Sequence, residues 1–174
     1  MIEKATLRDA DEVGALYDSV NDHLEATVNY PGWKKGLYPI REDAEDAIRE
    51  DTLFVLRENG QITGTVILSH RAESAYEQAP WGVELSPEQV LVVHTLAVHP
   101  QFRGRSVGRR LAEFAVEHAK AQGMRALRLD VNAKNVPAIR LYEGLGFALI
   151  DTVDMCYSLE ADERYRLYQL LLQA

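Results

Sequence analysis

The chain has 174 residues, with a hydrophobic fraction of 47% and a charged fraction of 26%, as an ordinary globular protein has. Its 27 acidic and 19 basic residues give a net charge of -8, which argues against a generally basic surface for nucleic acid. No apolar run reaches the ~20 residues of a membrane-spanning helix, and the first residues lack the pattern of a secretion signal. The single cysteine, Cys156, excludes a disulfide framework within the chain. We therefore expect one cytoplasmic domain, without a metal site and without nucleic-acid or membrane partners.

The first part of the chain predicts a short strand and two helices. Weak alternation over residues 2–7 indicates the strand, and Asp9 stands where the N-cap of the first helix is expected. We interpret residues 21–37 as a loop or a broken helix. A charged helix with a thin apolar stripe is expected over residues 42–50.

A hairpin follows, and after it strands and helices alternate. Asn59-Gly60 separates two β-rich runs and favours a tight two-residue turn. The run at 89–98 is apolar on both faces and is therefore expected inside a sheet. The predicted elements are strands at 52–58, 61–70, 89–98, 124–131, 147–155 and 164–172, helices at 107–123 and 135–145, and a loop at 71–87.

This order of elements predicts an α/β (α+β) fold around one sheet with helices on both faces. The unit from Val90 to Val131 runs strand, helix, strand. Such a unit is expected to form a parallel, right-handed crossover.

The turn before the helix at 107–123 has the features of an anion-binding site. A helix start exposes unpaired backbone N–H groups at the positive end of the helix dipole, a geometry that binds phosphate. Gly104 and Gly108 permit close approach of a ligand, and arginines nearby can add charge-assisted contacts. The same residues also fit a plain helix cap with a solvated arginine surface. No Gly-Lys-Ser/Thr follows, so the turn is not a Walker motif.

Two segments carry a resemblance to a known family. Gln101-Phe-Arg-Gly-Arg-Ser-Val-Gly108 resembles the acetyl-CoA signature Gln/Arg-x-x-Gly-x-Gly/Ala of the GCN5-related N-acetyltransferases. The segment from Leu129 to Phe147 resembles the strand and helix that follow in that family. The likeness implies a mixed, mostly antiparallel sheet with one parallel pair, and a single N-acetyltransferase domain over residues 1–174. Ser106 departs from the signature, where the family has Gly or Ala, and its hydroxyl can cap the helix or donate to a phosphate oxygen.

The resemblance implies acetyl-CoA as co-substrate, with its pyrophosphate held by backbone amides of the turn. The cofactor-binding residues that it implies are Leu96, Ala97, Val98, Arg103, Gly104, Arg105, Ser106, Val107, Gly108, Arg109, Asn135, Ala138 and Tyr142. Asn135 is also the expected N-cap of its helix.

The resemblance also implies direct attack of an amine on the thioester while both substrates are bound. Tyr142 is the candidate acid for the leaving thiolate, although a buried apolar stripe would equally place it in the core. His94 is the candidate base, in a segment similar to the corresponding strand of arylalkylamine N-acetyltransferases; a buried structural histidine is the alternative. Glu84 is a looser candidate, and His99 is expected to serve structure.

Aromatic residues mark the two irregular segments that flank the acceptor pocket in this family. They can wall an amine-binding cleft or contact a cation, or they can simply pack under long loops. These candidate substrate-binding residues are Trp33, Tyr38, Tyr76 and Trp81.

We expect an N-acetyltransferase that acts on a small primary amine. A protein acetyltransferase acting on a lysine or an N-terminus is one alternative, and a non-catalytic acetyl-CoA sensor domain is another. The acidic charge attracts polyamines and basic proteins alike, so it does not select between acceptors. The sequence does not determine the oligomeric state, and a homodimer is one possibility.

Overall fold

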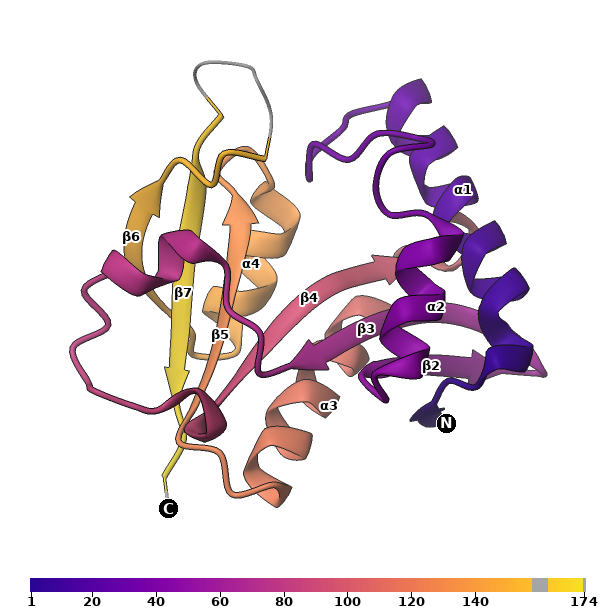
Figure 1. Ribbon diagram of the computed structural model, residues 1–174. Helices are drawn as coiled ribbons and strands as arrows, with labels where there is room; N and C mark the ends of the chain where they lie inside the picture. The colour runs from indigo at the N-terminus through magenta and orange to yellow at the C-terminus, as the bar shows by residue number, and fades with distance from the viewer. Residues whose placement is uncertain (158–162, 174) are drawn as a thin grey trace. The chain divides into compact units, whose positions relative to one another are not determined.

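The computed structural model describes residues 1–157 and 163–173 (Figure 1). Its helices are α1 (Ala10–Ala26), α2 (Arg41–Arg49), α3 (Val107–Ala121) and α4 (Val136–Gly144). Its strands are β1 (Ile2–Lys4), β2 (Leu53–Glu58), β3 (Gln61–Ser69), β4 (Val90–Val98), β5 (Ala126–Asn132), β6 (Ala148–Val153) and β7 (Tyr165–Leu171). The predicted order of elements is therefore confirmed.

The strands of the described residues form a mixed sheet in the order β1-β2-β3-β4-β5-β7-β6. β4 pairs in parallel with β5, through Val90–Val92 and Ala126–Arg128. β2 pairs antiparallel with both β1 and β3, and β7 pairs antiparallel with both β5 and β6. Asn59 and Gly60 join β2 to β3 with φ angles of 49° and 82°, the left-handed values that a tight hairpin turn requires. The predicted fold class is confirmed.

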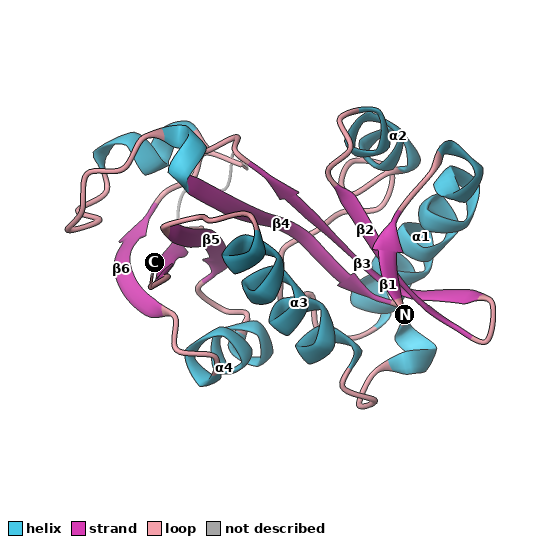
Figure 2. Ribbon diagram, turned by 90° about the horizontal axis from the view of Figure 1, so that it is seen from below, coloured by secondary structure: helices cyan, strands magenta, loops and turns pink. Residues whose placement is uncertain are grey.

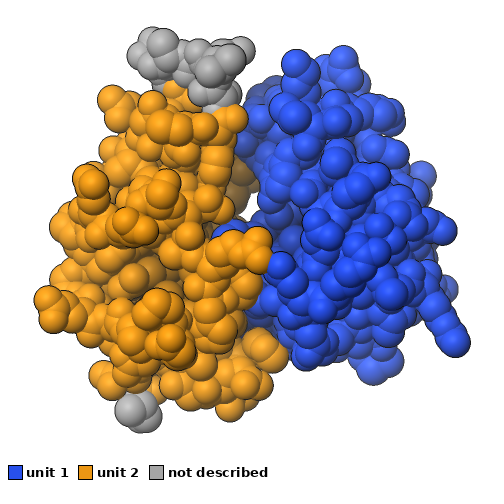
Figure 3. Space-filling view, viewed as in Figure 1, with its two compact units in different colours: residues 1–68, 94–115 blue, residues 69–93, 116–174 orange. Residues whose placement is uncertain are grey.

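The chain divides into two compact units, which Figure 3 colours separately. Unit 1 consists of Met1–Leu68 and His94–Ala115. Unit 2 consists of Ser69–Val93 and Val116–Ala174.

In unit 1, helices lie on both faces of the strands because successive residues of β2 point to opposite sides. Val55 is buried in one cluster with Leu16 and other apolar residues of α1 and α2, and Figure 2 shows these helices beside β1, β2 and β3. Phe54 points the other way, and its ring centroid lies 5.0 Å from that of Phe114 in α3. Gly64 permits α3 to approach β3, since an added Cβ would come within 2.7 Å of Val107.

In unit 2, the segment between β3 and β4 covers one face of β5 and β7. Tyr76 and Trp81 of that segment are buried in one cluster with Ala126 and Leu167. On the other face, the hydroxyl of Tyr168 in β7 donates to Glu143 of α4 at 2.8 Å. Successive side chains of β7 point to opposite faces of the sheet, so the segment between β3 and β4 packs on one face and α4 on the other.

Two sequence expectations need correction at the N-terminal helix. α1 continues to Ala26 into the segment expected to be irregular, because Asn21 and Leu24 are buried on its inner face. Asp9 precedes α1 as expected, yet its carboxylate accepts from the backbone N–H of Thr6 at 2.8 Å. Asp9 therefore caps the short 3-10 turn before α1 and not α1 itself. Within the described residues, no helix is long and apolar enough to cross a membrane.

Candidate functional site

The turn that opens α3 is exposed over residues 103–106. Gly104 and Ser106 both have positive φ angles, of 75° and 61°. The N–H of Arg110 donates to the carbonyl of Ser106 at 2.9 Å, so the N–H groups of residues 107–109 precede the first helical hydrogen bond and have no acceptor within the helix. Apart from its two chain neighbours, no heavy atom of the described residues lies within 4 Å of the position that a Cβ of Gly104 would take. An open cradle of amides at a helix N-terminus fits a pyrophosphate.

Some arginines around this turn already form an ion pair with a carboxylate, and others do not. Arg109 forms an ion pair with Glu113 at 2.7 Å, and Arg110 forms one with Glu58. Arg103 donates to the ring of His23, and the guanidinium of Arg105 lies 5.3 Å from the ring centre of Phe102. Among residues 1–157 and 163–173, neither Arg103 nor Arg105 has an ion pair. These two arginines are therefore the ones with charge to offer a phosphate.

The strand that leads into the turn is distorted where the acetyl group is expected. Thr95 has a φ of 44°, which is a strained value for a β-branched residue and occurs mostly at functional sites. The residues on either side, His94 and Leu96, are half-buried in β4. A hydrogen bond joins the hydroxyl of Tyr38 to that of Thr95. The distortion lies just before Leu96, Ala97 and Val98, the predicted contacts of acetyl-CoA.

His99 serves structure, as its position in the sequence suggested. Its backbone N–H donates to the carbonyl of Thr63 at 2.9 Å, and its ring accepts from the N–H of Gln101 at 3.3 Å. The ring also meets Phe102 edge-on at 5.7 Å. These contacts fix the short turn between β4 and the amide cradle.

In unit 2, α4 holds the other predicted residues of the cofactor site. Asn135 is its N-cap, as predicted, because its side-chain oxygen accepts from the N–H of Ala138 at 3.3 Å. Tyr142 lies one turn after Ala138 and is only 6% exposed, with its ring 5.5 Å from that of Phe147. Burial raises the pKa of Tyr142 above its ordinary value, and the negative charge of Asp130 raises it further. The phenol therefore keeps its proton at neutral pH.

The four candidate aromatic residues form two pairs, one in each unit. Trp33 and Tyr38 of unit 1 meet edge-on with ring centroids 6.0 Å apart. Tyr76 and Trp81 of unit 2 have centroids 5.4 Å apart, and both are almost fully buried. The indole N–H of Trp81 donates to the carbonyl of Tyr76 at 2.7 Å. The second pair thus packs in the core as well as lining a pocket.

Asp130 of β5 is a functional candidate that sequence reasoning missed. Its carboxylate accepts from the hydroxyl of Tyr76 at 2.7 Å and from that of Tyr157 at 3.4 Å. Burial raises the pKa of Asp130 to about 6, although the hydrogen bond from Tyr76 acts in the opposite direction. A carboxyl with this pKa can exchange a proton near neutral pH. The alternation of Arg128, Asp130 and Asn132 along an otherwise apolar strand was the available signal.

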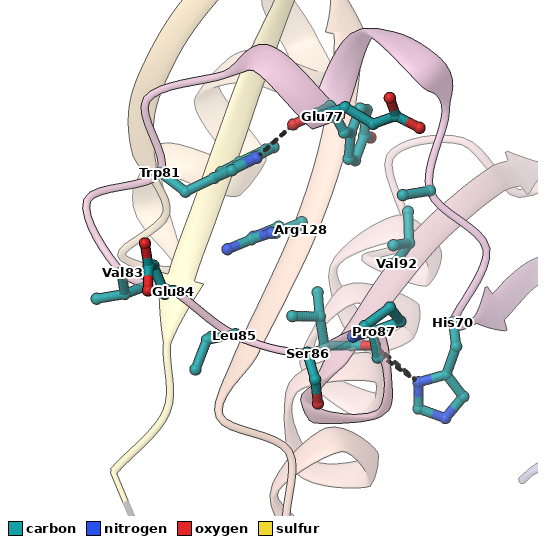
Figure 4. A pocket seen from close by; sticks show the side chains of 13 residues that line it. His70, Glu77, Trp81, Val83, Glu84, Leu85, Ser86, Pro87, Val92 and Arg128 are labelled. Atoms are coloured by element: carbon teal, nitrogen blue, oxygen red, sulfur yellow. Dashed lines mark hydrogen bonds between the residues drawn. The ribbon is translucent and has the colours of Figure 1, made fainter.

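Unit 2 also contains a pocket of about 490 Å³ beneath the segment between β3 and β4. Glu84, the looser candidate for the base, lines this pocket together with Glu77 and His70 (Figure 4). Tyr76 and Trp81 line it as well. The structure therefore groups one aromatic pair and Glu84 around one cavity. The amide cradle, Leu96–Val98 and His94 belong to unit 1, whereas α4 belongs to unit 2.

Solved structures share this fold. An acetyltransferase of the GNAT family from Streptococcus agalactiae aligns with a TM-score of 0.82 and 22% identity, covering 100% of this chain and 96% of that one. A protein from Salmonella typhimurium described as a putative acetyltransferase, solved with its cofactor acetyl-CoA, aligns with a TM-score of 0.73 and 17% identity, covering 100% of this chain and 94% of that one.

The sequence comparison shows the family directly. The model of the acetyltransferase (GNAT) family matches residues 17–147. An uncharacterized N-acetyltransferase of Methanocaldococcus jannaschii is 31% identical over 137 residues, which span 75% of this chain and 57% of that protein. The chain therefore belongs to the GNAT acetyltransferase family, and the resemblance found in the sequence is confirmed. Acetyl-CoA is the acyl donor that this family uses.

Proposed function

We propose that the protein is an N-acetyltransferase that transfers the acetyl group of acetyl-CoA to a small primary amine. The observation that carries this proposal is the amide cradle at the start of α3, with positive φ angles at Gly104 and Ser106. Such a cradle suits a diphosphate, and acetyl-CoA contains one. We also propose that both units act as one cytoplasmic acetyltransferase domain over residues 1–174.

Acetyl-CoA is proposed to bind through three groups of residues. The backbone of Leu96, Ala97 and Val98 takes the acetyl and pantetheine portion. The pyrophosphate is taken by the turn residues Arg103, Gly104, Arg105, Ser106, Val107, Gly108 and Arg109. Positive charge comes from Arg103 and Arg105, which form no ion pair with any other described residue. Asn135, Ala138 and Tyr142 complete the site from α4.

The reaction requires one bond to form, one bond to break and two proton movements. The amine nitrogen attacks the thioester carbonyl carbon, and collapse of the tetrahedral intermediate breaks the C–S bond. A backbone N–H of β4 stabilises the oxyanion of that intermediate. The phenol of Tyr142, which burial keeps protonated, gives its proton to the departing thiolate. The amine gives up its proton to a base.

Two residues can accept that proton, and they belong to different units. His94 lies in β4, next to the strained Thr95. Asp130 has the additional support of a pKa of about 6 and of two tyrosine hydroxyls that fix its carboxylate. An alkylamine has a pKa near ~10.4, so a group that accepts its proton at neutral pH raises the fraction that can attack.

A small acceptor is favoured over a protein by the pocket of about 490 Å³ in unit 2. Its volume suits a small molecule and its walls are largely aromatic and aliphatic. Acetylation of a protein lysine or N-terminus is the second candidate function. A sensor that binds acetyl-CoA without turnover is a third, and the presence of Tyr142 on α4 argues against it.

The test is release of free CoA thiol from acetyl-CoA in the presence of a panel of amines, with the acetylated product identified by mass. We expect release that depends on the amine and rises with pH. A panel of small amines and a panel of peptides with free lysines or N-termini separate the two acceptor classes. Binding of acetyl-CoA without transfer to either panel would favour the third candidate function, a sensor of acetyl-CoA.

A further inference from the structure

The pocket of unit 2 contains a cation whose hydrogen-bonding capacity is only partly used. Arg128 projects from β5 into the pocket and lies between Trp81 and Leu85 (Figure 4). Its Nε donates to the side-chain oxygen of Gln169 at 2.9 Å. Its guanidinium carbon lies 4.1 Å from the ring centre of Trp81. Its Nη2 is buried and has no hydrogen-bond partner among the residues that the structure describes.

This arrangement is costly in free energy because part of a charged group is buried. Burial lowers the pKa of Arg128 below its ordinary value, which shows that its charge is incompletely compensated. Within residues 1–157 and 163–173, no carboxylate forms an ion pair with Arg128. A buried charged donor without an acceptor is among the most unfavourable groups that a folded protein can contain. An anionic ligand would supply the missing acceptor.

The lining of the pocket selects the kind of anion. One guanidinium fits one carboxylate through two parallel hydrogen bonds. Glu77 and Glu84 also line the pocket, and their negative charge opposes a doubly charged phosphate more strongly than a single carboxylate. His70 also lines the pocket, with Nδ1 2.8 Å from the carbonyl of Val90. The apolar walls, such as Val92 and Leu85, suit a hydrocarbon body.

The pocket also adjoins the carboxylate that we propose as a proton acceptor. Tyr76 lines the pocket and donates to Asp130 at 2.7 Å. Arg128 and Asp130 are two residues apart on one face of β5, a spacing of about 6–7 Å along an extended strand. Because Arg128 and Asp130 are neighbours on that face, a ligand that reaches both carries its carboxylate and its amine several bonds apart.

We propose that Arg128 binds the carboxylate of a zwitterionic acceptor whose amine is acetylated, and so selects small amines that carry an acid several bonds away. This inference rests on the proposed function, because it assigns the acidic end of the acceptor of that same reaction. Arg128 is then a residue that determines specificity. The matching class comprises ω-amino acids and the shortest peptides with a free carboxylate.

A local fluorescence titration tests the pocket without any transfer reaction. The chain has 2 tryptophans, so Trp33→Phe leaves Trp81, which touches Arg128, as the single reporter. The ligands are 5-aminopentanoate and its carboxamide, which have the same length and differ in the terminal group, a charged carboxylate against a neutral amide. We expect the acid to bind at least tenfold more tightly than the carboxamide. Equal affinities for the two ligands would overturn the proposal.

Variants at Arg128 sharpen the titration. In the Trp33→Phe background, Arg128→Gln keeps an amide donor and removes the charge, so the preference for the acid should fall to within twofold. Arg128→Lys keeps the charge without the planar fork and should retain an intermediate preference. A preference for the acid that survives Arg128→Gln unchanged would place the carboxylate elsewhere. If Arg128→Gln does not fold, the comparison of the two ligands on the parent protein still decides.

The same ligand pair then serves as acceptor in the transfer assay with the unmodified chain. We expect kcat/KM for the acid to exceed that for the carboxamide at least tenfold, mostly through KM. Transfer to both acceptors without preference would leave the proposed function standing and overturn the role of Arg128. Absence of transfer to any amine would overturn the proposed function, while the Trp81 titration would still decide whether the pocket binds carboxylates.

Discussion

The turn that opens α3 and the polar face of β5 are built to meet charge in different ways. The turn offers backbone N–H groups, and its shape depends on positive φ angles at Gly104 and Ser106. The face of β5 offers side chains, Arg128 and Asp130, that neighbouring elements hold in place. A site made of backbone constrains which residues the chain can use, whereas a site made of side chains depends on partners that are distant in sequence.

The largest expected effect is a loss of turnover without a loss of acetyl-CoA affinity. Tyr142→Phe removes the proposed acid and leaves the ring packed on Phe147, so turnover should fall about 100-fold or more while acetyl-CoA affinity is unchanged. Steady-state kinetics and calorimetry measure the two quantities. Tyr168→Phe is the matched control, because it removes another buried hydroxyl of unit 2 that donates to Glu143. Unchanged turnover in Tyr142→Phe would remove the phenol from the mechanism.

The next effect tests the polar face of β5. Asp130→Asn should lower kcat/KM about 100-fold at pH 8 without changing acetyl-CoA affinity, because the amide cannot accept a proton. In the unchanged chain kcat/KM should decrease as the pH falls through about 6, where Asp130 becomes protonated. His94→Gln provides the comparison for the other candidate base. If His94→Gln removes the pH dependence and Asp130→Asn preserves it, His94 is the base.

Asp130 also predicts a dependence of stability on pH. Its pKa is about 6 in the folded protein and near 3.8 unfolded, so the folded state binds the proton more tightly. The resulting stabilisation is present below pH 4 and is lost as the pH rises through 6. The free energy of unfolding of Asp130→Asn relative to the unchanged chain should therefore rise by about 2 kcal/mol between pH 4 and pH 8. Denaturant titrations at the two pH values measure it, and a constant difference would contradict the shifted pKa.

A smaller effect distinguishes the arginines of the turn. Arg103→Ala should weaken acetyl-CoA binding about fivefold, since within the described residues Arg103 contacts the ring of His23 and forms no ion pair. Arg109→Ala should weaken it less, because Arg109 is already paired with Glu113. Both differences should shrink in high salt. The reverse ranking in a calorimetric titration would show that the ion pair with Glu113 opens when the ligand binds.

The smallest effect concerns the departure from the family signature. Ser106 has a φ of 61°, which costs a residue with a Cβ about 1 kcal/mol, whereas glycine adopts it freely. Ser106→Gly should raise the free energy of unfolding by less than about 1 kcal/mol and leave acetyl-CoA affinity within twofold. A large loss of affinity would instead show that the serine hydroxyl contacts a phosphate oxygen.

The position and backbone geometry of the turn could be predicted from the sequence, whereas the polar face of β5 could not. The turn depends on residues that are adjacent in the chain, and the face of β5 depends on distant ones. Glycines and arginines at a strand-to-helix junction follow from local geometry, so Gly104 and the neighbouring residues could be recognised in advance. The N-cap role of Asn135 is likewise local, and the structure confirms it. The hairpin at Asn59-Gly60 and the parallel pair of β4 with β5 also followed from turn chemistry and element order.

Asp130 could not be identified from the sequence because its properties come from Tyr76, which is 54 residues away. The irregular segment between β3 and β4 has no periodicity that places its aromatic residues over β5. The same segment supplies Trp81 to the guanidinium of Arg128. Only the alternation of polar residues on β5 indicated that its face was unusual.

The most direct test of the account is a calorimetric titration with acetyl-CoA of the unchanged chain, Gly104→Glu and Gly60→Glu. Both glycines have positive φ angles and open space around them, but Gly60 lies at the hairpin tip, so it controls for strain and added charge. We predict micromolar binding to the unchanged chain and to Gly60→Glu, and none to Gly104→Glu. Equal binding to all three proteins, or no binding to the unchanged chain, would contradict the assignment of the amide cradle to acetyl-CoA.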